Sequence, residues 1–223
     1  MKIKDAYVSF IELVNRNATN NNINVDHQRF VLLFNKTSIQ FISWVLEKRN
    51  EDVIRTISPL LILEKPLTKD ITTPTYTSFN LPLDYFELAN VHAYGTKGMC
   101  IDQKLKTFEI KSENIEELLD DDSNKPSFDY REVPYLTGSK KVNIYKTDFD
   151  ISKASLSYYR YPKQVDIAGY YRLDNSYSNL DIDPEFDDKV VYKILTAMAK
   201  QFAATNGDVN SYQIRKDELF SEI

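Results

Sequence analysis

The sequence predicts an α+β fold in which N- and C-terminal helices form one helical bundle, with a small antiparallel β region inserted between them. Two observations predict it. Apolar residues recur at helical spacing near both ends of the 223-residue chain, whereas the middle alternates at strand spacing and contains several prolines. We therefore expect residues 1–65 and 184–223 to form the bundle and residues 66–183 to form a β-rich region with long loops.

Three helices are expected in the N-terminal part. The first spans about residues 2–18 and ends at an asparagine-rich stretch, because asparagine side chains compete for backbone hydrogen bonds. The second spans about residues 26–49, with Asp26 as its cap. The third spans about residues 51–63 and contains Pro59, which should kink it or end it early.

The middle of the chain predicts a few short strands. Residues 66–78 are rich in threonine and proline, which is typical of a linker or an extended arm. Residues 113–122 predict a short acidic helix. Alternating apolar residues predict four strands, at about 86–94, 99–110, 141–147 and 154–161.

Two helices are expected at the C-terminal end. The first spans about residues 185–204, because Asp183 can cap it and Pro184 suits a first turn. The second spans about residues 208–221 and is more polar.

Composition excludes some classes of function. The net charge of −5 argues against a protein that grips DNA, and five glycines are too few for a glycine-rich phosphate cradle. Fifteen tyrosines and twelve phenylalanines suit either core filling or a large subunit interface. Cys100 is the single cysteine, which fits a reducing cytoplasm. No apolar run is long enough for a membrane span or a secretory signal, so we expect a soluble protein that binds no membrane.

Several segments, taken in order, point to a known family. They are the turn Leu81-Pro82-Leu83-Asp84-Tyr85-Phe86, the strand end Leu156-Ser157-Tyr158-Tyr159-Arg160-Tyr161-Pro162, the acidic turn Asp181-Ile182-Asp183-Pro184-Glu185-Phe186, and a tail helix with Tyr212, Gln213 and Glu218. From about residue 79 to the end, the chain resembles the head-to-tail connector, or adaptor, family of tailed phages. That family includes tail tubular protein A of short-tailed phages and the ring proteins of crAss-like phages. The order and spacing of the segments carry the resemblance.

The resemblance implies a non-enzymatic structural protein of the virion tail or neck, assembled in the host cytoplasm. Copies of the chain would form a dodecameric ring that joins the portal protein to the next tail or ring protein. The helical bundle would be the body of the ring, and the last helix would dock onto the portal. The ring would form part of the DNA ejection channel, through which DNA passes without sticking. No catalytic residue, cofactor or metal is expected.

The candidate interface residues are mostly aromatic or basic. Arg160 lies between tyrosines just before Pro162, where it could stack on a ring or pair with an acid of a neighbouring subunit, although an intrachain pair is the simpler alternative. Further tyrosines at positions 170, 171 and 177 could stack single-stranded bases, but packing or interface contact suits their few basic neighbours better. The interface candidates are Tyr158, Tyr159, Arg160, Tyr161, Tyr212, Gln213 and Arg215.

Rival interpretations remain open. The acids between residues 181 and 188 invite a calcium site, but they lack the glycine and spacing of an EF-hand loop, and acids at a helix start explain them better. A tail-associated hydrolase would need Cys100 and His92 to meet as a thiol–imidazole pair across two strands. Another phage tail-completion or baseplate protein, or a host adaptor, would differ in symmetry.

Overall fold

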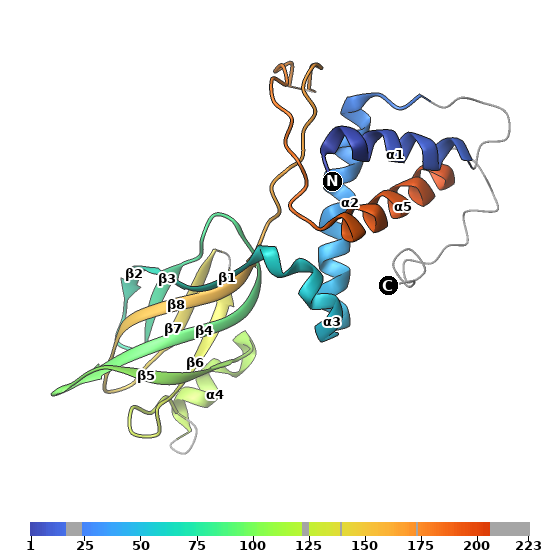
Figure 1. The fold of residues 1–223 in the computed structure, drawn as a ribbon. Coiled ribbons are helices and arrows are strands. Elements are labelled where there is room, and N and C mark those ends of the chain that lie inside the picture. Colours follow the sequence, from blue (N-terminus) through green and yellow to red (C-terminus); the bar gives the residue numbers. More distant parts are fainter. Residues whose placement is uncertain (17–23, 122–124, 139, 173, 206–223) are drawn as a thin grey trace. The chain divides into compact units, whose positions relative to one another are not determined.

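The chain folds into two units, which we call the helical unit and the sheet unit. A computed structural model describes residues 1–16, 24–121, 125–138, 140–172 and 174–205 (Figure 1). The helical unit contains the described parts of 1–60 and 162–223, and the sheet unit is Leu61–Tyr161. The boundaries thus follow residues 60 and 161, where we had expected them after residues 65 and 183.

Three long helices build the helical unit. They are α1 (Ile3–Arg16), α2 (His27–Lys48) and α5 (Asp188–Thr205). The carboxylate of Asp26 caps α2 by accepting a 2.6 Å hydrogen bond from the Arg29 N–H. Arg49 ends α2 in the left-handed conformation, with φ 51°. Within this unit α5 packs against both α1 and α2 (Figure 1).

Aromatic rings fill the space between these helices. Phe10 of α1 lies 5.5 Å from Phe30 of α2 and 6.1 Å from Phe202 of α5, measured between ring centroids. Such tilted and edge-on pairs add to the stabilisation from buried area. Part of the aromatic excess in the composition therefore serves the core of the helical unit.

Eight strands form one mixed sheet in the sheet unit. Neighbouring strands follow the order β1-β8-β4-β5-β6-β7-β3-β2, and only β5 and β6 run parallel. The 3₁₀ turn η2 (Ser112–Asn114) and the short helix α4 (Ile115–Asp120) lie in the connection between β5 and β6. The strands are β1 (Leu61–Pro66), β2 (Thr68–Thr72), β3 (Tyr76–Asn80), β4 (Tyr85–Lys97), β5 (Cys100–Glu109), β6 (Glu132–Gly138), β7 (Lys141–Tyr145) and β8 (Asp150–Arg160).

The sheet is curled (Figure 1), and its two edge strands, β1 and β2, follow one another in the chain. Only Leu67 separates β1, which pairs with β8, from β2, which pairs with β3. The Leu67 N–H donates a 2.9 Å hydrogen bond to the Ala154 carbonyl, which holds this crossing against β8. Inward-facing residues of β4, such as Val91 and Ala93, join a buried apolar core with residues from the other strands.

The predicted fold class is wrong. The β region is not a small antiparallel insertion between bundle helices, because it is a curled eight-stranded mixed sheet that forms a unit of its own. The predicted strands correspond to β4, β5, β7 and β8, and four others were missed. Residues 66–78, predicted as a linker, contribute to β1, β2 and β3. Threonine is β-branched and suits a pleated strand, and the prolines there fall at the end of β1 and in the turn after β2.

Two predicted helices also differ in extent. The helix expected over 51–63 is the single turn α3 (Glu51–Ile54), which continues as the 3₁₀ segment η1 (Arg55–Leu60) around Pro59. The helix expected from residue 185 begins at Asp188. The acids before it bind other groups, since Asp183 accepts a hydrogen bond from the Ile3 N–H and Glu185 accepts one from the Lys163 N–H. The predicted helix at 208–221 lies outside the described residues.

Candidate subunit interface

A hydrogen-bonded cluster joins β1, the turn before β4, and β8. The hydroxyl of the buried Tyr158 donates a 2.8 Å hydrogen bond to the Asp84 carboxylate. The Lys65 ammonium donates to the same hydroxyl at 3.2 Å and lies 3.7 Å from Asp84. Burial and the hydrogen bond to Asp84 raise the pKa of Tyr158 above its ordinary value, so its hydroxyl stays protonated and able to donate. The cluster fixes how the turn enters β4.

Two more contacts extend this junction toward the end of β8. The Tyr161 N–H donates a 2.8 Å hydrogen bond to the Asp84 carbonyl oxygen. The rings of Phe86 and Tyr161 meet edge to face, with centroids 4.8 Å apart. The fold thus brings together residues 81–86 and 156–162, two of the segments on which the family resemblance rests.

The interface candidates on β8 fall into two groups. Tyr158 and Tyr159 are buried within the chain, so neither offers a broad contact surface. Tyr161 keeps 47% of its surface exposed, and the half-buried Arg160 donates to the Tyr161 carbonyl at 3.1 Å. The other candidates, Tyr212, Gln213 and Arg215, lie outside the described residues.

A two-stranded arm of the helical unit exposes a second aromatic pair. We call residues 162–187 the arm; its orange trace runs between β8 and α5 (Figure 1). Its ends are bridged at Asp166 and Ile182, and its outer part at Tyr171 and Tyr177. The two tyrosine rings meet edge to face at 5.0 Å and remain 67% and 48% exposed. Leu180, another residue of the arm, is 72% exposed.

A buried carboxylate holds the arm in shape. Asp166 accepts hydrogen bonds from the Tyr170 and Ser178 hydroxyls, each at 2.9 Å, and pairs with the Arg172 guanidinium. Burial alone would raise the pKa of Asp166, but these hydrogen bonds outweigh it and hold the pKa below its ordinary value. Burial and the bond to Asp166 raise the pKa of Tyr170 to about 12.

The acids at the base of the arm bind groups of the arm and of α1. Asp181 accepts from the Ala168 N–H at 2.8 Å and pairs with Lys4 of α1 at 2.7 Å. Asp183 accepts a 2.8 Å hydrogen bond from the Ile3 N–H at the start of α1. Within the described ranges, no three potential metal-ligating side chains lie close enough to hold an ion.

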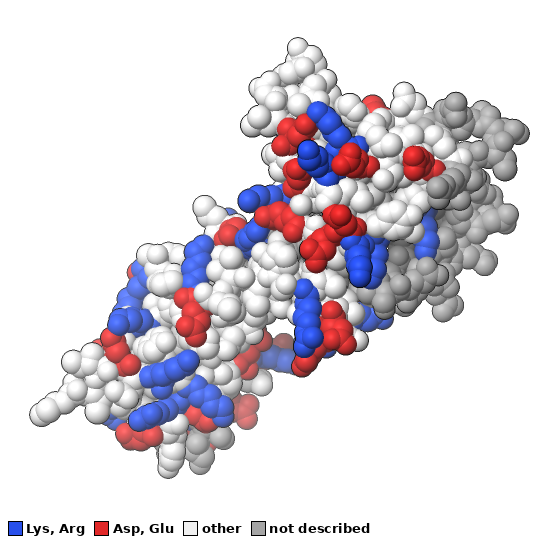
Figure 2. Space-filling model, viewed as in Figure 1, with Lys and Arg blue, Asp and Glu red and all other residues white. Residues whose placement is uncertain are grey.

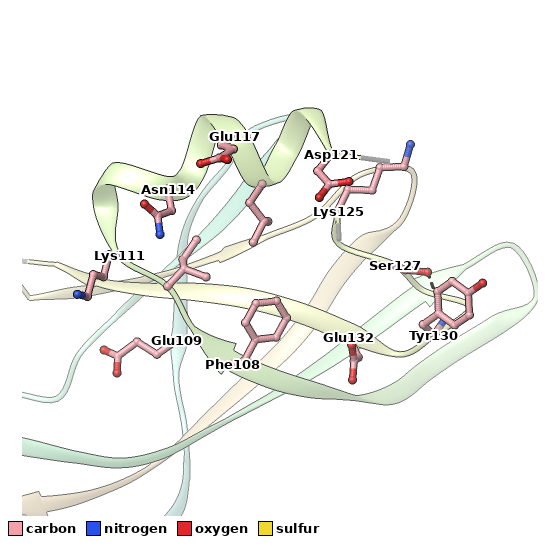
Figure 3. A pocket seen from close by; sticks show the side chains of 12 residues that line it. Phe108, Glu109, Lys111, Asn114, Glu117, Asp121, Lys125, Ser127, Tyr130 and Glu132 are labelled. Carbon is pink, nitrogen blue, oxygen red and sulfur yellow. Dashed lines mark hydrogen bonds between the residues drawn. The ribbon is translucent and has the colours of Figure 1, made fainter. Parts of the chain in front are cut away.

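A hollow of about 850 Å³ lies beneath α4 in the sheet unit (Figure 3). Phe108, Ile110 and Leu118 supply its apolar part, and charged side chains such as Glu109 and Glu117 line its rim. The carboxylate of Glu132 is paired with Lys106 at 2.9 Å. Tyr130 is also part of the rim, and its N–H donates to the Ser127 hydroxyl at 3.2 Å.

The thiol–imidazole pair required by a hydrolase does not form. Cys100 is exposed at the hairpin tip, opposite Lys97, whereas His92 pairs with Ser155 well inside the sheet. Five residues of strand between His92 and Lys97 correspond to roughly 16 Å. The His92 ring instead lies 3.7 Å from the Glu64 carboxylate.

Comparisons with known proteins add no family assignment: no protein-family model matches the chain, and no curated protein matches it either. None of the described helices has the length and apolar character that a bilayer crossing requires. The function of the chain is therefore inferred from its sequence and from the geometry of the described residues.

Proposed function

We propose that the chain is a structural subunit of the neck of a tailed bacteriophage, where copies form a ring between the portal and the next tail or ring protein. The observation that carries the proposal is the junction of residues 81–86 with residues 156–162 through Asp84 and Tyr158. Asp84 and Tyr158 are 74 positions apart in the sequence, and their contact supports treating the two family-like segments as one structural element of the sheet unit.

The exposed aromatic arm supports assembly of copies side by side. Ring closure needs two different surfaces on each subunit, so that one face of a copy meets the other face of the next. Tyr171 and Tyr177 offer two exposed aromatic rings of the kind that interfaces recruit. The Asp166 hydrogen bonds hold the arm in one conformation before assembly, which lowers the entropic cost of binding.

The charge of the chain suits a DNA channel that does not bind its cargo. Twelve copies, each with a net charge of −5, would sum to about −60. A ring with that surplus repels the phosphate backbone, so DNA slides through it. On the face drawn in Figure 2, acidic and basic side chains are interspersed over much of the surface.

Electron microscopy of the chain mixed with its cognate portal protein tests the proposal. A ring of copies stacked on the portal with the same rotational symmetry supports it. A chain that never adds to the portal, or an assembled ring that binds DNA tightly in low salt, contradicts it.

A further inference from the structure

The outer face of the curled sheet carries a hollow with a positive surplus. Its volume is about 520 Å³, and it lies between β4, β5 and the loop before β6. The outward-facing residues of β5 contribute Lys104 and Lys106, and the loop contributes Arg131 and Tyr130. His92 of β4 closes one side, and no acidic residue lines the hollow. In Figure 2 blue side chains gather over the region of β4 and β5.

Two cations of this hollow differ from most other lysines of the sheet unit. Most lysines outside the hollow form an ion pair within the chain, whereas Lys104 and Arg131 form none among the described residues. Lys106 forms an ion pair with Glu132. Paired lysines outside the hollow include Lys65, Lys97, Lys141, Lys146 and Lys153. On a chain of net charge −5, two cations in one hollow that lack an acidic partner among the described residues suit an acidic partner from another molecule.

The same unit carries an acidic surface of matching character. Glu113 of η2 and Glu116, Glu117 and Asp120 of α4 are all exposed, and none of the four forms an ion pair among the described residues. Their spacings of three and four residues place Glu116 and Asp120 on one side of the helix. Like charges this close repel one another, so a cationic partner relieves them.

We propose that the acidic side of α4 in one copy docks into the cationic hollow of the next copy. The proposal rests on the proposed function and deepens it, because it names one pair of surfaces through which copies meet. The surfaces carry opposite charge, and Tyr130 lines both the cationic hollow and the hollow beneath α4. Docking would cover Tyr130, which is 82% exposed at the rim, and would bring Lys104 and Arg131 within reach of carboxylates. Single exposed ion pairs are weak, so the contact depends on several charges acting together and on low salt.

A charge exchange in the full-length chain tests this contact. The variant Lys104→Glu/Arg131→Glu makes the hollow acidic, and the variant Glu116→Lys/Asp120→Lys makes the helix basic. Each variant alone then presents like charges at both halves of the contact, so we expect self-association, measured by sedimentation with and without portal, to weaken at least about tenfold. In an equal mixture, every contact between unlike variants pairs opposite charges, so copies that alternate should assemble again.

Matched controls change the same charges elsewhere. Lys2→Glu/Lys140→Glu and Glu12→Lys/Glu87→Lys alter exposed residues that belong to neither surface, and these variants should assemble like the wild type. If both exchanged variants assemble as well as the wild type, or if their mixture does not recover assembly, this contact is overturned and the proposed function is left intact. A wild-type chain that stays monomeric even with portal overturns both.

Discussion

The Tyr158 hydroxyl donates its hydrogen bond to the carboxylate of Asp84, which lies 74 positions earlier in the chain. Lys65 donates to the same hydroxyl from β1. Three parts of the sheet unit therefore meet at one buried phenol: the edge strand β1, the turn before β4, and the end of β8.

Replacing Tyr158 by phenylalanine should destabilise the sheet unit. The substitution keeps the buried ring but removes the donor, so Asp84 keeps only its more distant pairing with Lys65. We expect a loss of about 1 kcal/mol in the free energy of unfolding, measured by urea denaturation. Tyr161→Phe is the control, because that ring is half exposed at the same strand end. Equal stability of the two variants would show that the Asp84 bond contributes nothing.

Replacing Gly95 by alanine should strain the core of the sheet. A Cβ atom at Gly95 would lie 2.8 Å from the Leu105 Cδ1 atom, and Leu105 is buried. Overpacking of this kind costs about 1–3 kcal/mol. Gly138→Ala is the matched control, because a Cβ atom at Gly138 would meet nothing within 4 Å. If thermal denaturation finds both variants as stable as the wild type, the packing described at Gly95 is incorrect.

The arm should open in acid. The pKa of Asp166 is held below its ordinary value in the folded chain, so its contribution to stability is present above the unfolded pKa of about 4 and is lost as the pH falls below it. Hydrogen exchange at the Gly169 and Ser178 amides, which bridge the arm, reports this opening. Asp166→Asn should lower the free energy of opening of the arm by about 1–3 kcal/mol, so that both amides exchange faster already at neutral pH. The variant Asp52→Asn, outside the arm, should match the wild type; a pH-independent arm would contradict this account.

Removing the exposed tyrosines of the arm should impair assembly without affecting stability. Tyr171→Ser/Tyr177→Ser deletes two exposed rings whose burial against a neighbour would each be worth a few kcal/mol. We expect fewer copies bound per portal and an unchanged melting temperature. Tyr192→Ser removes a similarly exposed ring from α5 and serves as the control. Full assembly by the double variant would exclude the arm from the subunit contact.

The helices were largely predictable from local signals. Apolar spacing and the Asp26 cap gave α2 to within one residue at each end, because both signals lie within the segment itself. The strands β1 to β3 were not predictable in this way, since threonine and proline are common in loops and in edge strands alike. Nothing within residues 66–78 shows that β3 will pair with β7, whose partner residues lie some 65 positions later.

The candidate site was predictable only in part. Alternation along β8 places Tyr158 inside the sheet, but the burial of Tyr159 depends on its pairing with Leu61 of β1, which the sequence does not reveal. The arm did carry a signal: Asp174, Asn175 and Ser176 form a polar turn between tyrosines, and Asn175 adopts φ 61°, which asparagine tolerates. The acids at the base of the arm could be read as acceptors, but their partners on α1 lie some 180 residues away.

Native mass measurement of the full-length chain with its cognate portal, alongside a variant lacking residues 208–223, tests the central claim most directly. We predict that the wild-type chain adds one 26.0 kDa copy for each portal subunit, and that the truncated chain keeps its fold but does not bind. A wild-type chain that leaves the mass of the portal unchanged would contradict the account.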